Sequence, residues 1–251
     1  MSELTMDRLR ENLESLKMKN TLEILDNYLE RAVAENLNIV EVLDHIFSEE
    51  AKSKRKRAYE KQVQMSGFPI KKTLDDFDFS FQPSIDKRQI DELATMRFLE
   101  NGENVVFLGP PGVGKTHLAS ALGLVAAQHR FSTYYINCHQ LIEQLKKAHF
   151  ENRLPDKLKI LAKYRMLIID EIGYLPMDIQ GANLFFQLIA RRYEKTSTVF
   201  ILRLTVLLLM HSIVLKNNGS RREPITQIAI ILYIIVGIGS FPMWMLRNSM
   251  S

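Results

Sequence analysis

Apolar residues recur with a helical period through the first quarter of the chain. They fall three or four positions apart in three groups, with charged residues between them. The groups are Met6, Leu9, Leu13 and Leu16; Leu22, Leu25 and Leu29; and Ile39, Val42, Leu43 and Ile46. Asn38 followed by Glu41 is a capping-box pattern at the start of the third group. The pattern predicts a small all-α N-terminal domain.

The helical period ends at SGFP, residues 66–69. Glycine permits a left-handed turn, and proline excludes the residue before it from the α region. We therefore place a domain boundary here and expect the helical domain to cover residues 1–68. Residues 71–84, KKTLDDFDFSFQPS, have no helical period and predict an extended linker that lies against the next domain. A helix is expected at about 86–100, so that residues 69–100 form a linker and a helix.

From Asn104 onward, short apolar runs alternate with helical segments. The runs VVFLG, STYYINC and RMLIIDE have the length and composition of strands. Strands that alternate with helices predict a parallel sheet flanked by helices. We expect an α/β core over residues 101–200, and a chain of 251 residues is long enough for this core and the small helical domain.

The segment GPPGVGKT, residues 109–116, satisfies the full G-x-x-x-x-G-K-[ST] pattern between an apolar strand and a helix. Its three glycines allow the backbone to aim successive N–H groups at phosphates, and the helix N-terminus adds partial positive charge. Lys115 would pair with the β- and γ-phosphates, and the Thr116 hydroxyl would coordinate Mg²⁺. The pattern therefore predicts a site for ATP with magnesium.

The run RMLIIDEIG ends a buried strand with two carboxylates, Asp170 and Glu171. Asp170 would hold the magnesium shell, and Glu171 would polarise the attacking water as general base, so the pair predicts hydrolysis as well as binding. The predicted catalytic residues are Glu171 and Lys115, and the predicted magnesium residues are Thr116 and Asp170. The predicted nucleotide-binding residues are Gly109, Pro110, Pro111, Gly112, Val113, Gly114, Lys115, Thr116, His117 and Asp170.

Three stretches, GFPIKKTLDDFDF, FLGPPGVGKTHLASALG and LIIDEIGYLPMD, resemble the IstB family. This family comprises AAA+ ATP-binding helper proteins of insertion sequences, and the resemblance covers roughly residues 10–200. It implies an AAA+ P-loop core, binding of ATP and DNA, self-assembly on DNA, and assistance to a partner transposase in target selection. The bacterial helicase loader and replication initiator are relatives of the family.

Two clusters of positive charge are candidates for DNA contact. Residues 139–165 carry seven lysine and arginine residues against three acidic ones, and residues 51–61 carry a dense basic run. Basic residues in such positions would neutralise phosphates. The candidates are Lys52, Lys54, Arg55, Lys56, Arg57, Lys146, Lys147, Lys157 and Lys159. No base-reading pattern is evident, so we expect DNA binding with little sequence preference. A solvated helix face or an acidic partner protein are alternatives that the sequence leaves open.

The remaining composition points to the cytoplasm. The single cysteine, Cys138, excludes an intramolecular disulfide and any multi-cysteine zinc site, and the charged N-terminus lacks the apolar core of a secretory signal. Besides a transposition helper, two other functions are compatible with the sequence. One is a helicase-loader-like module that acts in DNA replication through protein docking, and the other is a degenerate product without function.

The C-terminal 50 residues are atypical for the family. Beyond Thr198 no asparagine follows the strand at its tip, and residues 224–246 contain no charged side chain over 23 positions, enough to span a bilayer. Residues 201–251 could be out-of-frame translation, which we favour, a membrane anchor, or divergent core strands. Without a proper fifth strand the sheet would have an open edge. We then expect weakened ATP binding, poor hydrolysis and aggregation.

Overall fold

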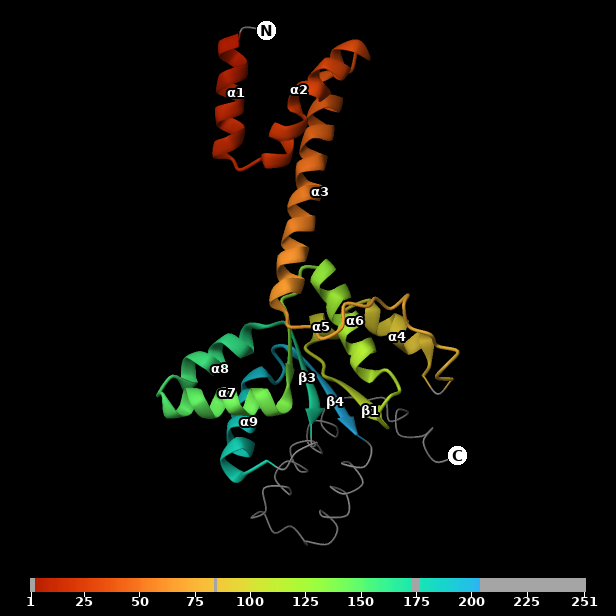
Figure 1. Cartoon of the computed structure of the whole chain (residues 1–251), viewed down its shortest axis with the longest axis vertical. Helices are drawn as coiled ribbons and strands as arrows, with labels where there is room; N and C mark the ends of the chain where they lie inside the picture. Colours follow the sequence, from red (N-terminus) through yellow and green to blue (C-terminus); the bar gives the residue numbers. More distant parts are fainter. Residues whose placement is uncertain (1–2, 84, 173–176, 204–251) are drawn as a thin grey trace. The chain divides into compact units, whose positions relative to one another are not determined.

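The computed structural model describes residues 3–83, 85–172 and 177–203 (Figure 1). These residues belong to two compact units, Met1–Lys61 and Gln62–Ser251. Nearly all of the atypical C-terminal segment, and with it the apolar run 224–246, lies outside the described residues. Among the helices that the structure does describe, none has both the length and the apolar character needed to cross a membrane.

The first unit is helical, as the periodic pattern predicts. Its helices are α1 (Glu3–Ser15), α2 (Lys19–Ala34) and the greater part of α3 (Ile39–Met65). The capping box at the start of α3 is confirmed, because the Asn38 side chain accepts from the backbone N–H of Glu41 at 3.0 Å and the Glu41 carboxylate accepts from that of Asn38 at 3.0 Å. Apolar residues of all three helices and the α1–α2 turn form the core of this unit, among them Leu13, Met18, Leu25, Tyr28 and Ile46.

The second unit is built on a four-stranded sheet in which every pairing is parallel. Its strands are β1 (Val105–Gly109), β2 (Thr133–Asn137), β3 (Met166–Ile172) and β4 (Ser197–Arg203), in the order β1-β4-β3-β2. Apolar runs buried on both faces are typical of parallel strands. The predicted α/β fold is therefore confirmed, and the fourth strand lies beside the strand that precedes the glycine loop.

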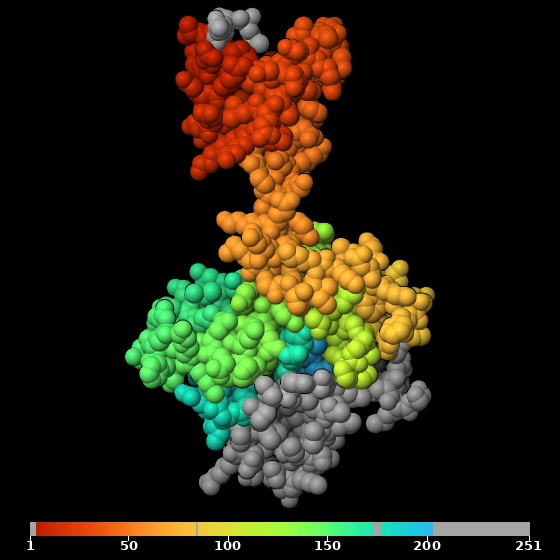
Figure 2. Space-filling view, viewed as in Figure 1, coloured from red at the N-terminus to blue at the C-terminus, as the bar shows by residue number. Residues whose placement is uncertain are grey.

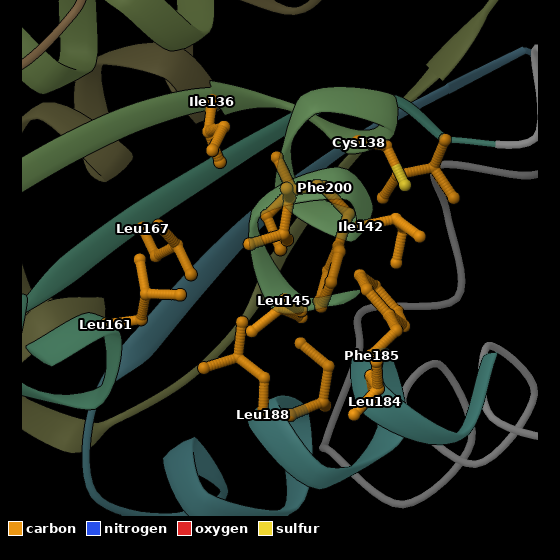
Figure 3. Close-up of a cluster of buried hydrophobic side chains, with 14 of the residues drawn as sticks. Ile136, Cys138, Ile142, Leu145, Leu161, Leu167, Leu184, Phe185, Leu188 and Phe200 are labelled. Atoms are coloured by element: carbon orange, nitrogen blue, oxygen red, sulfur yellow. The ribbon is translucent and has the colours of Figure 1, made fainter. Parts of the chain in front are cut away.

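Helices cover both faces of the sheet (Figure 1). Those of this unit are α4 (Lys87–Ala94), α5 (Arg97–Asn101), α6 (Lys115–Gln128), α7 (Cys138–Phe150), α8 (Leu154–Lys163) and α9 (Ile179–Arg192). On one face α7, α8 and α9 bury a cluster that includes Leu145 and Phe185 (Figure 3). On the other face α6 packs with α4 and α5 over Phe107 and Ile168.

The predicted helix at 86–100 is two helices rather than one. The Thr95 hydroxyl donates to the carbonyl of Glu92 at 2.7 Å, and Met96 has a left-handed backbone with φ of +64°. A bulky residue in this conformation cannot continue an α-helix. The Met96 side chain is only 1% exposed, and its burial stabilises the break between α4 and α5.

Candidate nucleotide-binding site

The glycine loop joins the end of β1 to the start of α6. Gly112 and Gly114 both have φ of +85°, a conformation that favours glycine. A Cβ on Gly114 would come within 2.4 Å of the Phe77 ring. Gly114 also caps α6 without a side-chain acceptor, so the first turn of α6 presents backbone N–H groups that can bind an anion.

The Lys115 side chain folds back over the loop. Its ammonium donates to the carbonyl of Gly109 at 3.0 Å and to that of Pro110 at 2.6 Å. These are weaker partners for an ammonium than phosphate oxygens, because they carry no net charge. The lysine is therefore close to the predicted phosphate position and held by contacts that a nucleotide can replace.

Thr116 and Asp170 meet although they are 54 residues apart in the sequence. The Thr116 hydroxyl donates to Oδ2 of Asp170 at 2.7 Å, and Asp170 is 4% exposed at the carboxyl end of β3. A hydroxyl and a carboxylate are oxygen donors of the kind that Mg²⁺ prefers. The chemistry of this pair fits the magnesium role that the sequence predicts for both residues.

Glu171, the predicted general base, is exposed and has a left-handed backbone with φ of +58°. The register between β3 and β4 shifts at this point, between Ile169 and Ile172. Its carboxylate accepts a hydrogen bond from the side-chain amide of Asn137, at the end of β2. Asn137 was not a sequence-predicted site residue. In the described conformation it holds the carboxylate that would activate water.

Tyr135, two residues earlier on β2, is a second residue that the sequence did not single out. Its hydroxyl donates to Oδ2 of Asp170 at 2.6 Å, the same oxygen that accepts from Thr116. Burial raises the pKa of Tyr135, and the hydrogen bond to Asp170 raises it further, so the ring remains a neutral donor. Residues 133, 135 and 137 share one face of β2. This alternation was the sequence signal that could have placed Tyr135 and Asn137 on the same face.

The linker packs against the glycine loop, and His117 faces it. The His117 Nε2 lies 3.0 Å from the carbonyl oxygen of Thr73, and its ring meets that of Phe77 edge to face at 5.2 Å. Pro110 and Pro111 are exposed, and Val113 is half-buried. The structure thus places the predicted nucleotide-binding residues around one loop, with the His117 ring directed to the linker.

Comparisons with known proteins show the family of this chain. A family model described as IstB-like ATP binding protein matches residues 11–210. The chain belongs to this family. The match extends to residue 210, beyond the range of roughly residues 10–200 that the motif-based resemblance covers, and so includes all of β4.

Two relatives from insertion sequences resemble this IstB-like chain over most of its length. An ATP-binding protein of insertion sequence IS232 from Bacillus thuringiensis subsp. berliner is 50% identical over 192 residues, which is 76% of this chain and 77% of the relative. That of IS21 from Pseudomonas aeruginosa is 44% identical over 194 residues, 77% and 73% of the two chains. A crystal structure of the DnaI protein aligns with a TM-score of 0.49 and 21% identity, covering 63% of this chain and 86% of that one.

Several residues in the basic run of α3 in this IstB-like chain form ion pairs inside the first unit. Glu50 is 3% exposed and accepts from the backbone N–H of Thr21 at 2.9 Å. Arg57 and Lys54 approach the other oxygen of Glu50 at 3.3 and 3.8 Å. Lys52 pairs with Glu49 at 2.7 Å. Some of the basic residues that were predicted to contact DNA therefore pair with buried Glu50 inside the protein.

Two of the five DNA candidates in this run have no such contact. Arg55 and Lys56 are exposed and form no ion pair with any residue that the structure describes. These two candidates can bind a phosphate without giving up an ion pair.

The second basic cluster lies on the hairpin formed by α7 and α8. The atoms of this hairpin, green in Figure 2, are at the surface of the second unit. Lys146 pairs with Asp178 at 3.0 Å, and partial burial lowers the pKa of Lys157. Lys147 and Lys159 are exposed and have no ion pair within the described ranges. Of the four candidate lysines on this hairpin, these two are therefore open to an external anion.

Proposed function

We propose that this IstB-like chain binds ATP with magnesium at the β1–α6 loop and acts as an ATP-dependent DNA-binding helper of transposition. The observation that supports it best is the 2.7 Å contact between the Thr116 hydroxyl and the Asp170 carboxylate beside the glycine loop. This contact joins the two predicted magnesium residues from separate elements. Family membership and the two insertion-sequence relatives support the same proposal.

Nucleotide binding would use groups that are already near one another. Lys115 would exchange the carbonyls of Gly109 and Pro110 for phosphate oxygens, and the N–H groups of the loop and of the first turn of α6 would hold the remaining phosphate charge. Thr116 and Asp170 would hold Mg²⁺, which would neutralise charge at the phosphates. The protein's own contribution is to position the nucleotide and the metal.

Hydrolysis would require a second step at Glu171. Its carboxylate must take the proton of the attacking water, and in the described conformation it is bound to the Asn137 amide. Hydrolysis therefore depends on a rearrangement that separates the two side chains. We propose that ATP binding favours assembly of several copies on DNA, and that hydrolysis releases them.

DNA contact would fall on the exposed cations without internal partners. We propose Arg55 and Lys56 of α3 and Lys147 and Lys159 of the α7–α8 hairpin as phosphate contacts, while Lys52, Lys54, Arg57, Lys146 and Lys157 are secondary candidates. Contacts of this kind neutralise phosphates without reading bases, so affinity should vary little with sequence and fall steeply with salt. The proposed protein partner is a transposase.

Salt-dependent binding to duplex DNA tests the DNA part of this proposal. A double variant, Lys147→Ala with Lys159→Ala, should make the fall of log affinity with log salt shallower by about 2 in slope. Each lost phosphate contact changes this slope by about 0.9. Arg55→Ala with Lys56→Ala should act similarly. Lys195→Ala, which removes an exposed charge outside both clusters, is the control. Unchanged slopes in both double variants would contradict the assignment.

A pull-down with the intact chain tests the partner. Retention of the transposase supports the transposition role. Retention of a replicative hexameric helicase in its place would contradict it and support a helicase-loader-like role.

A further inference from the structure

Tyr135 connects three parts of the second unit through hydrogen bonds. Its hydroxyl donates to Asp170 Oδ2 at 2.6 Å, and that oxygen also accepts from Thr116 at 2.7 Å. Its backbone N–H donates to the carbonyl of Ser66 at 2.7 Å, just after the end of α3. No other residue that the structure describes joins the Asp170 carboxylate to the segment following α3 in this way.

We propose that Tyr135 positions Asp170 for magnesium and thereby sets the concentration of Mg²⁺ that the nucleotide site requires. This inference rests on the proposed function, since it concerns the same site. Tyr135 is a positioning residue, because its hydroxyl contacts Asp170 and acts through that carboxylate.

The carboxylate of Asp170 is held by three donors. Oδ1 accepts from the backbone N–H of Glu171 at 2.6 Å, and Oδ2 accepts from Thr116 and Tyr135. Asp170 is 4% exposed, and no ion pair with it is present among the described residues. A buried carboxylate without a cationic partner depends on its hydrogen bonds to stay oriented. If the Thr116 oxygen turned to a metal ion, Tyr135 and the Glu171 N–H would still orient the Asp170 carboxylate.

The position of the Tyr135 hydroxyl is itself fixed by the backbone around it. Ser66 is fully buried, and its hydroxyl lies 3.0 Å from both the carbonyl oxygen and the hydroxyl of Thr133. Gly67 has φ of +70°, and a Cβ there would lie 3.1 Å from the carbonyl oxygen of Tyr135. The segment after α3 therefore closes the outer edge of β2 and fixes the strand that carries the tyrosine.

The test compares Tyr135→Phe with Tyr134→Phe. The first change removes one oxygen and keeps the ring that packs on the α6 face. The second removes the same atom from the neighbouring residue, whose ring stacks on Tyr164 at 5.0 Å on the opposite face. Binding of a fluorescent ATP analogue is measured by equilibrium titration over a range of Mg²⁺ concentrations and in EDTA, and thermal unfolding is followed on the same samples.

Tyr135→Phe should need about tenfold more Mg²⁺ for half-maximal binding, because loss of such an outer partner weakens metal affinity by about 10- to 100-fold. Affinity in EDTA and the melting temperature should match those of the parent, and Tyr134→Phe should behave as the parent throughout. An unchanged magnesium dependence in Tyr135→Phe would overturn the inference while leaving nucleotide binding intact. The inference would also be overturned if Tyr135→Phe lost nucleotide affinity equally with and without magnesium and had a lower melting temperature than the parent. If the parent chain binds no nucleotide, the proposed function itself fails.

Discussion

The side-chain amide of Asn137 has two roles that can be separated by mutation. Its oxygen accepts from the backbone N–H of His139 at 2.8 Å and caps α7, while its nitrogen donates to the carboxylate of Glu171. Only the second contact restrains the proposed general base. The orientation of the Glu171 carboxylate therefore depends on a residue of the neighbouring strand.

Asn137→Ser should raise hydrolysis of ATP by the chain in the absence of DNA. Serine is a good N-cap, so α7 keeps its cap, but its side chain carries no amide to hold Glu171. Asn137→Ala should show the same increase and in addition lose about 1 kcal/mol of unfolding free energy, because the cap is lost. Steady-state hydrolysis assays and urea unfolding of both variants separate the two effects. A rate in Asn137→Ser equal to or below that of the parent would show that the amide does not restrain Glu171.

At the scale of elements, a buried guanidinium fixes the last described strand. Arg192, at the end of α9, is 1% exposed and donates to the carbonyls of Leu161, Tyr164 and Ser197 at 2.7, 2.9 and 2.6 Å and to the Thr198 hydroxyl at 2.9 Å. It thereby joins α8, α9 and the start of β4, the strand between the glycine-loop strand and β3. Burial lowers the pKa of Arg192 to about 9.

Arg192→Met should lower the free energy of unfolding by about 3 kcal/mol, because it leaves buried carbonyl groups without donors. Arg191→Met, which changes the exposed neighbour, should differ from the parent by about 0.5 kcal/mol or less. Chemical unfolding monitored by circular dichroism gives both values. Equal stabilities of the two variants would show that Arg192 does not hold β4 in the sheet.

Several elements could be predicted from sequence because their signals are local. The capping box at Asn38, the glycine loop and the apolar strand ending at Asp170 each lie within about a dozen residues. The break at Met96 could not be predicted, because it depends on burial of that side chain within the second unit. Tyr135 and Asn137 were missed because their roles follow from the pairing of β2 with β3, and the strand order decides which side chains meet.

At the scale of the whole molecule, composition predicted positive charge but could not show which charges have partners. Glu50 of α3 is buried against Thr21 of α2, 29 residues away in the sequence. Its carboxylate also attracts Lys54 and Arg57 of the basic run. Only tertiary structure separates these residues from Arg55 and Lys56. The expectations for residues 204–251, including the effect of a missing fifth strand, remain predictions.

The central claim is that the glycine loop binds ATP with magnesium and that binding is coupled to DNA. The most direct measurement is equilibrium binding of a fluorescent ATP analogue with magnesium, comparing the chain with Lys115→Ala and, as a charge-matched control, Lys195→Ala, each with and without duplex DNA. DNA should strengthen binding in the parent and in Lys195→Ala, and Lys115→Ala should abolish binding. Binding that survives Lys115→Ala, or a soluble parent chain that binds no analogue, would contradict it.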